Sequence, residues 1–130
     1  MSKVSFGIPL ATLLRLALGA GAGWAQPAAA AGPGDAVRGK QLYQACTSCH
    51  SIDENDIGPR HRGVLGRAAG SLSDYAYSPA LKASGVVWDA ASLDRWLTNP
   101  QALVPGAKMF FSLPDPQSRA DIIAFLGTLK

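Results

Sequence analysis

Cysteine, histidine and charged residues are scarce in this sequence, and each shortage disfavours a class of protein. With two cysteines and two histidines in 130 residues, a zinc site built from paired cysteines is disfavoured. Charged residues make up 16% of the chain and form no basic stripe among aromatics, so nucleic-acid binding gains no support. No convincing alternating strand occurs, and the βαβ pattern of thiol-redox proteins is missing. A small chain with room for one core remains.

The N-terminal segment has the pattern of a secretory signal peptide. A basic start is followed by an apolar stretch that only Arg15 interrupts, and small residues surround possible cleavage points. The alternative is an uncleaved anchor, although Arg15 shortens the apolar run below the roughly 20 residues of a spanning helix. We expect three segments: a signal peptide at 1–25, an Ala/Pro/Gly linker at 26–34 and a domain at 35–130.

Cleavage of this segment would change the charge of the protein. The full chain has 12 Lys and Arg against 9 Asp and Glu, but Lys3 and Arg15 lie in the part that is removed. The remainder has 10 basic and 9 acidic residues, which is a net charge of +1 instead of +3. We expect this remainder to lie in the periplasm.

Capping residues and helical spacing predict an all-α protein of four to five short helices joined by long loops. Asp35, Asp89 and Asp115 are each placed to cap a helix, and Asn99-Pro100 is a stop signal. Many glycines between residues 51 and 73 predict a loop of the length that usually wraps something. The expected helices cover 36–45, 79–83, 90–98 and a last segment from Pro116.

Cys46 and Cys49 lie three residues apart, and His50 follows directly. This spacing suits thioether bonds to the two vinyl groups on one edge of a haem, and the adjacent histidine can bind the iron. A disulfide across so short a loop would stabilise little. We predict one haem c attached through Cys46 and Cys49, with zinc binding or a disulfide as the alternatives.

Met109 is the one methionine of the expected mature chain, and it follows the turn residues Pro105-Gly106. We predict that it binds the iron opposite His50, because a thioether is a soft ligand that favours ferrous iron. With both axial positions filled, outer-sphere electron transfer is the remaining function. His61 is the rival ligand, but it follows the cysteine motif on the same loop, so we expect it to be solvated or packed at the haem edge.

Several further segments of residues 35–130 resemble one known family. They are Gly39-Lys40-Gln41-Leu42-Tyr43, Gly58-Pro59, Gly66-Arg67, Trp96-Leu97-Thr98-Asn99-Pro100 and Val104-Pro105-Gly106-Ala107-Lys108-Met109. The family is the class I c-type cytochromes, which includes mitochondrial cytochrome c and its small bacterial relatives. The resemblance implies the cytochrome c fold, in which short helices and long loops surround one covalent haem c.

The resemblance also implies roles for single residues around that haem. The Pro59 carbonyl would accept a hydrogen bond from the proximal histidine's ring N–H. Arg67 would lie near the inner propionate, where a buried carboxylate needs a cation. Phe125 would pack against the first helix near Gly39. Aromatic residues are expected around the propionates, with the last two as hydrogen-bond donors: Tyr75, Tyr77 and Trp88.

The sequence departs from the mitochondrial pattern at several positions. Trp96 replaces a tyrosine near the methionine sulfur, so that hydrogen bond is predicted to be lost or changed. Ala107 replaces a hydroxyl residue that often bonds a propionate. Gln101 and Ala102 stand where mitochondrial members place lysines near the exposed haem edge, which leaves Lys108. We therefore expect a weakly basic docking face and modest steering by charge.

These observations favour a one-electron carrier over an enzyme. We expect it to act as a monomer that meets respiratory or other periplasmic redox proteins transiently at the exposed haem edge. Membrane contact is expected only through those partners or an uncleaved N-terminal segment. The alternatives are a dedicated subunit of a larger oxidoreductase complex and a haem enzyme or gas sensor that releases Met109.

Overall fold

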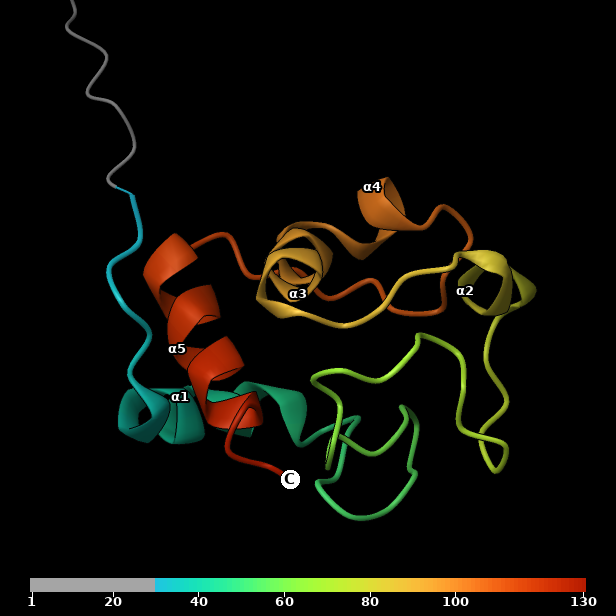
Figure 1. The fold of residues 1–130 in the computed structure, drawn as a ribbon, viewed down its shortest axis with the longest axis horizontal. Coiled ribbons are helices and arrows are strands. Elements are labelled where there is room, and N and C mark those ends of the chain that lie inside the picture. The colour runs from blue at the N-terminus through green and yellow to red at the C-terminus, as the bar shows by residue number, and fades with distance from the viewer. Residues whose placement is uncertain (1–29) are drawn as a thin grey trace, which may run out of the picture.

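In the computed structural model, which describes residues 30–130, short helices are joined by long loops (Figure 1). The expected signal peptide lies outside this range. The described residues contain no strand, only an isolated bridge between Ala68 and Val87, so the predicted all-α class is confirmed. None of their helices has the length and apolar character that a membrane crossing requires. The helices are α1 (Ala36–Leu42), the 3₁₀ helix η1 (Tyr43–Cys46), α2 (Pro79–Ala83), α3 (Ala90–Thr98), α4 (Pro100–Leu103) and α5 (Pro116–Leu126).

Polar side chains at the helix starts set the helix bounds. Asp35, Asp89 and Asp115 accept hydrogen bonds from backbone N–H groups in the first turns of α1, α3 and α5, as the sequence predicts. The first expected helix is shorter than predicted, because its last turn tightens into η1. Asn99 ends α3 but also caps α4, where Pro100 takes the first helical position. The expected stop signal therefore also begins a helix.

Helices α1 and α5 cross in close contact at Gly39 (Figure 1). A Cβ atom at this position would overlap the main-chain carbonyl of Asp121 and lie 2.9 Å from Cβ of Phe125. The rings of Tyr43 and Phe125 meet beside the crossing with centroids 5.2 Å apart. The absence of a side chain at Gly39 thus sets the distance between the two helices.

A buried carboxylate ties the start of α1 to α5. Asp121 is 2% exposed and accepts four hydrogen bonds. One comes from the backbone N–H of Asp35 at 2.8 Å, two from the Arg38 guanidinium at 2.9 and 3.0 Å, and one from the Gln117 amide at 3.0 Å. The Gln117 side chain also bonds the main chain of Gly32 and Pro33. These bonds compensate for burying the charge and hold the chain before α1 against α5.

The substitution Asp121→Asn is expected to lower the midpoint of thermal unfolding at pH 7 by about 10 °C, because a neutral amide cannot satisfy the donors around it. The Arg38 guanidinium and the other donors hold the pKa of Asp121 well below the usual value of about 3.9. The charged carboxylate therefore stabilises the fold fully at pH values above its ordinary pKa of about 3.9. This stabilisation is lost as the pH falls through the lowered pKa of the folded state.

Unfolding midpoints measured at several pH values check this prediction. The difference between wild type and Asp121→Asn should shrink as the pH falls from about 5 to about 2, because the wild-type carboxylate becomes protonated. Glu54→Gln, at an exposed position, is the control and should match the wild type throughout. A difference that does not depend on pH would contradict the charged role of Asp121.

Candidate haem-binding site

A cavity of about 260 Å³ lies between the helices and the long loop that follows η1. Both cysteines and both histidines line it, as does Met109. Much of the buried apolar core lines it too, so the core is a shell around the cavity. Such a concave apolar site with a few polar groups is typical of a cofactor site. The core residues in the lining are Tyr43, Val64, Tyr77, Leu81, Trp88, Leu93, Trp96, Leu97, Ile122 and Leu126.

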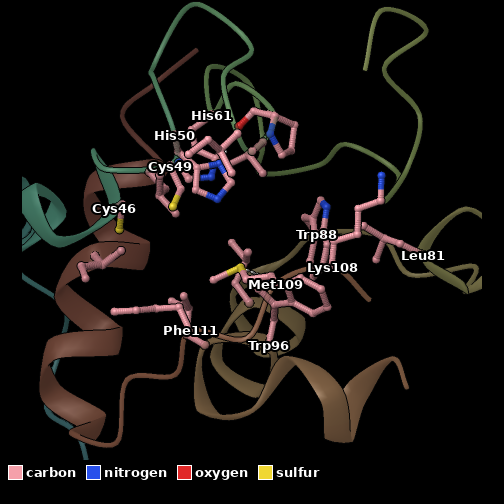
Figure 2. Close-up of a pocket in the computed structure, with 18 of the residues that line it drawn as sticks. Cys46, Cys49, His50, His61, Leu81, Trp88, Trp96, Lys108, Met109 and Phe111 are labelled. Atoms are coloured by element: carbon pink, nitrogen blue, oxygen red, sulfur yellow. Dashed lines mark hydrogen bonds between the residues drawn. The ribbon is translucent and has the colours of Figure 1, made fainter. Parts of the chain in front are cut away.

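The turn after η1 places Cys46, Cys49 and His50 along one side of the cavity (Figure 2). The backbone N–H groups of Cys49 and His50 donate to the Cys46 carbonyl at 3.1 and 2.9 Å, which closes the turn. Cys46 and Cys49 form no disulfide with each other, and without a thioether bond burial raises the pKa of the Cys46 thiol to about 11. Residues 30–130 hold no group of three or more metal-binding side chains of the His, Cys, Asp or Glu type. The disulfide and zinc alternatives therefore gain no support.

His50 has a defined orientation and protonation. Its Nδ1–H donates to the Pro59 carbonyl at 2.7 Å, because a carbonyl can only accept. A Cβ atom at Gly58 would overlap the imidazole, so this glycine leaves the space that the ring occupies. Burial lowers the pKa of His50 and favours the neutral ring. With Nδ1 protonated, the free electron pair is on Nε2, the arrangement that a metal-binding histidine needs.

His61 stacks on His50 and is half-buried. The ring centroids are 4.1 Å apart, with 22° between the ring planes. The Tyr43 hydroxyl bonds Nδ1 of His61 at 2.9 Å. Burial, with His50 and Arg67 nearby, lowers the pKa of His61 to about 3, so the ring is neutral. His61 therefore lies on the His50 side of the cavity, which agrees with the expectation that it does not reach the opposite side.

Met109 lies across the cavity from His50, in a loop that we call the methionine loop (residues 104–114) (Figure 2). The indole N–H of Trp96, from α3, donates to the Met109 sulfur at 3.2 Å. Trp96 is itself buried and packs edge-on against Trp88, with ring centroids 5.2 Å apart. The hydrogen bond to the sulfur is thus changed and not lost, since an indole donates where mitochondrial members have a phenol.

The residues expected around the propionates all line the cavity, but two of them already donate hydrogen bonds to main-chain carbonyls. The Tyr75 hydroxyl donates to the Ile57 carbonyl at 2.5 Å, so it is already engaged. Arg67 donates through Nη2 to the Arg60 carbonyl at 2.8 Å, and burial lowers its pKa. Tyr77 is buried, which raises the pKa of its hydroxyl.

Sequence reasoning did not predict how the methionine loop is held. Gln101 was expected at the docking face, yet its amide bonds the main chain of this loop. Arg119 is buried and donates to the carbonyls of Leu113 and Pro114 at 2.9 and 2.8 Å, while its Nε donates to Asp94 at 2.7 Å. Neither residue lies in a recognisable motif, so no sequence signal indicates these contacts.

The groups around the cavity fit a haem. Thiols suited to thioether bonds lie on one side, the imidazole of His50 lies beside them, and the Met109 thioether lies opposite. Aromatic and aliphatic side chains supply the apolar surface that a porphyrin requires, and the Arg67 guanidinium supplies a cation for a carboxylate. Nitrogen, sulfur and apolar surface are the combination that haem iron and its macrocycle bind.

Comparison with known proteins agrees with this site. A family model described as cytochrome c matches residues 36–130. Cytochrome c2 of Rhodomicrobium vannielii is 46% identical over 85% of this chain and 90% of its own length. Cytochrome c of Euglena viridis is 45% identical over 75% of this chain and 99% of its own.

Solved structures give the same result for the fold. Cytochrome cH from Methylobacterium extorquens superposes with a TM-score of 0.71 at 45% identity, over 73% of this chain and 99% of its own. Ferricytochrome c2 from Rhodopseudomonas palustris superposes with a TM-score of 0.71 at 35% identity, over 74% and 99%. The chain therefore belongs to the class I c-type cytochromes, electron carriers and not enzymes, and carries one haem c attached covalently through Cys46 and Cys49.

Proposed function

We propose that this cytochrome is a one-electron carrier whose haem iron is bound by His50 and Met109. The observation that carries the proposal is the placement of the His50 imidazole and the Met109 thioether across one cavity from each other (Figure 2). Haem iron supplies reversible one-electron chemistry when bound, and two side-chain ligands leave it no open position for oxygen or peroxide. His61 lies on the His50 side, which leaves Met109 as the ligand opposite.

The surrounding residues would keep both ligands in place during electron transfer. The Pro59 carbonyl holds the ring orientation of His50, and the Trp96 indole holds the Met109 sulfur. Ligands held by hydrogen bonds move little when the charge of the site changes. We further propose that Arg67 and three aromatic residues of the cavity lining receive the propionates, with Tyr77 and Trp88 as donors and Tyr75 next to Tyr77.

The proposed contact surface for redox partners surrounds the cavity mouth. Ile57, Phe110 and Phe111 all line the cavity and are 71%, 78% and 42% exposed. Lys108, the basic residue expected there, donates through Nζ to the Ala76 carbonyl at 2.7 Å. A small apolar surface with little free charge suits brief docking that depends weakly on salt.

Copurification with an enzyme in fixed ratio would favour the alternative, in which this cytochrome is a dedicated subunit of a larger oxidoreductase complex.

We also propose that the carrier works in the periplasm between respiratory or other redox proteins. Support comes from the secretory pattern of residues 1–25. Sequencing the N-terminus of the mature protein distinguishes a cleaved signal peptide from a retained anchor. A chain that still begins at Met1 would favour the anchor.

The optical spectrum of the wild-type ferric protein tests the ligand assignment. We expect a low-spin spectrum with the weak near-infrared band of sulfur-to-iron charge transfer, because His50 and Met109 would occupy both axial positions. A high-spin spectrum would overturn the proposal and favour a haem enzyme or gas sensor with an open iron position.

A further inference from the structure

Gln101 in α4 makes an unusual set of contacts for one side chain. Its amide nitrogen donates to the carbonyls of Ala107 and Met109 at 2.8 and 2.9 Å, and its amide oxygen accepts from the Gly106 N–H at 3.2 Å. The three partners lie within four consecutive residues of the methionine loop. One side chain thus bonds three main-chain groups of the short segment that leads into Met109.

The main chain next to Met109 has little other support. Of the described main-chain groups between residues 108 and 112, the Met109 carbonyl alone takes part in a hydrogen bond, and its donor is Gln101. The following residues, Phe110 and Phe111, are exposed. Support resumes at Leu113, whose N–H donates to the Leu97 carbonyl at 2.7 Å. The main chain of residues 108–112 is therefore held by one hydrogen bond, which the Gln101 amide donates.

Two side chains of the loop make polar contacts: Lys108 donates through Nζ to the Ala76 carbonyl at 2.7 Å, and the Met109 sulfur accepts from Trp96. Ala107 is buried but offers no side-chain donor, and Gly106, with φ of +89°, has no side chain at all. The Trp96 indole orients the Met109 sulfur but does not bond the backbone. Gln101 and Trp96 thus hold different parts of Met109, one its main chain and the other its thioether.

We infer that Gln101 is a positioning residue that keeps Met109 on the iron. The inference rests on the proposed ligation by His50 and Met109. Without the two bonds from its amide nitrogen, the loop turns away more readily, and a ligand from solution replaces the thioether at lower concentration. The function of Gln101 is thus to disfavour an open iron position and not to contact the haem.

Imidazole binding to the ferric holoprotein tests this role. Gln101→Met keeps the length of the side chain but removes all three hydrogen bonds, and we expect its apparent affinity for imidazole to rise at least about tenfold. Gln101→Glu keeps the acceptor for Gly106 but has no N–H for the two carbonyls, so it should behave like Gln101→Met. Loss of the sulfur-to-iron charge-transfer band directly reports that imidazole has replaced the Met109 thioether.

Controls separate this role from a general loss of stability. Gln41→Met, at an exposed position of α1, is the matched control and should bind imidazole as the wild type does. Unchanged imidazole affinity in Gln101→Met, or wild-type affinity in Gln101→Glu, would overturn the inference, even where denaturation shows reduced stability. A wild-type spectrum without the sulfur band would instead overturn the proposed ligation, and this inference with it.

Discussion

Substitution of Met109 by alanine is expected to change the ferric haem from low-spin to high-spin and to abolish the sulfur-to-iron charge-transfer band. The physical reason is that alanine cannot bind the iron, and no other histidine, cysteine or methionine of the described residues lies on that side of the cavity, while the Lys108 amine is engaged with the Ala76 carbonyl. The reduction potential should fall by on the order of 0.2 V, part of the roughly 0.8 V range that axial ligands control. A thioether stabilises the ferrous form, so its loss favours the ferric one.

Optical spectra and redox titration of the purified holoprotein check this prediction. Phe110→Ala is the matched control, since Phe110 is adjacent in sequence but 78% exposed and has no ligand atom. It should keep both the band and the potential. Persistence of the band in Met109→Ala would show that its sulfur comes from somewhere other than Met109.

Gly39→Ala is expected to destabilise the folded protein by about 2–4 kcal/mol, because the added methyl group must push α1 and α5 apart. The methyl would overlap the Asp121 carbonyl, which belongs to the backbone of α5 and cannot turn aside as a side chain does. The greater helix propensity of alanine, about 1 kcal/mol, offsets only part of this cost. Separation of the helices would also stretch the bonds between Arg38 and Asp121.

Guanidinium denaturation of the two holoproteins measures the effect. Gly127→Ala is the control, since Gly127 follows α5 with φ of −63° and an added Cβ would meet its nearest atom at 3.3 Å. This variant should remain within about 1 kcal/mol of the wild type. If Gly39→Ala and Gly127→Ala unfolded at the same denaturant concentration, the close contact of α1 and α5 at Gly39 would not control the stability of the fold.

Features that depend on neighbouring residues could be predicted from the sequence. The turn of Cys46, Cys49 and His50 is closed by hydrogen bonds within five residues, so its spacing alone indicates the chemistry. The caps at Asp35 and Asp89 likewise bond groups two or three residues away. The all-α class followed from such signals, while the ligand roles of His50 and Met109 stay predictions.

Contacts between distant residues could not be predicted in this way. Arg38 and Asp121 are 83 positions apart, and nothing in either local pattern indicates that they pair. The stacking of His61 on His50, which are 11 positions apart, is also a contact that no local pattern indicates. Gln101 bonds main-chain groups only five to eight positions further along the chain, but these contacts also lack a sequence motif.

The sequence by itself therefore determined the attachment chemistry, the helix class and the candidate ligands, because each depends on residue types at short, fixed spacings. Only the tertiary structure decided which side of the cavity each candidate occupies and which side chains hold it there. The reason is that packing of α1 against α5 and of the loops around the cavity brings together groups that the chain keeps far apart. For Met109, the sequence supplies the sulfur, but the fold brings Trp96 and Gln101 to it.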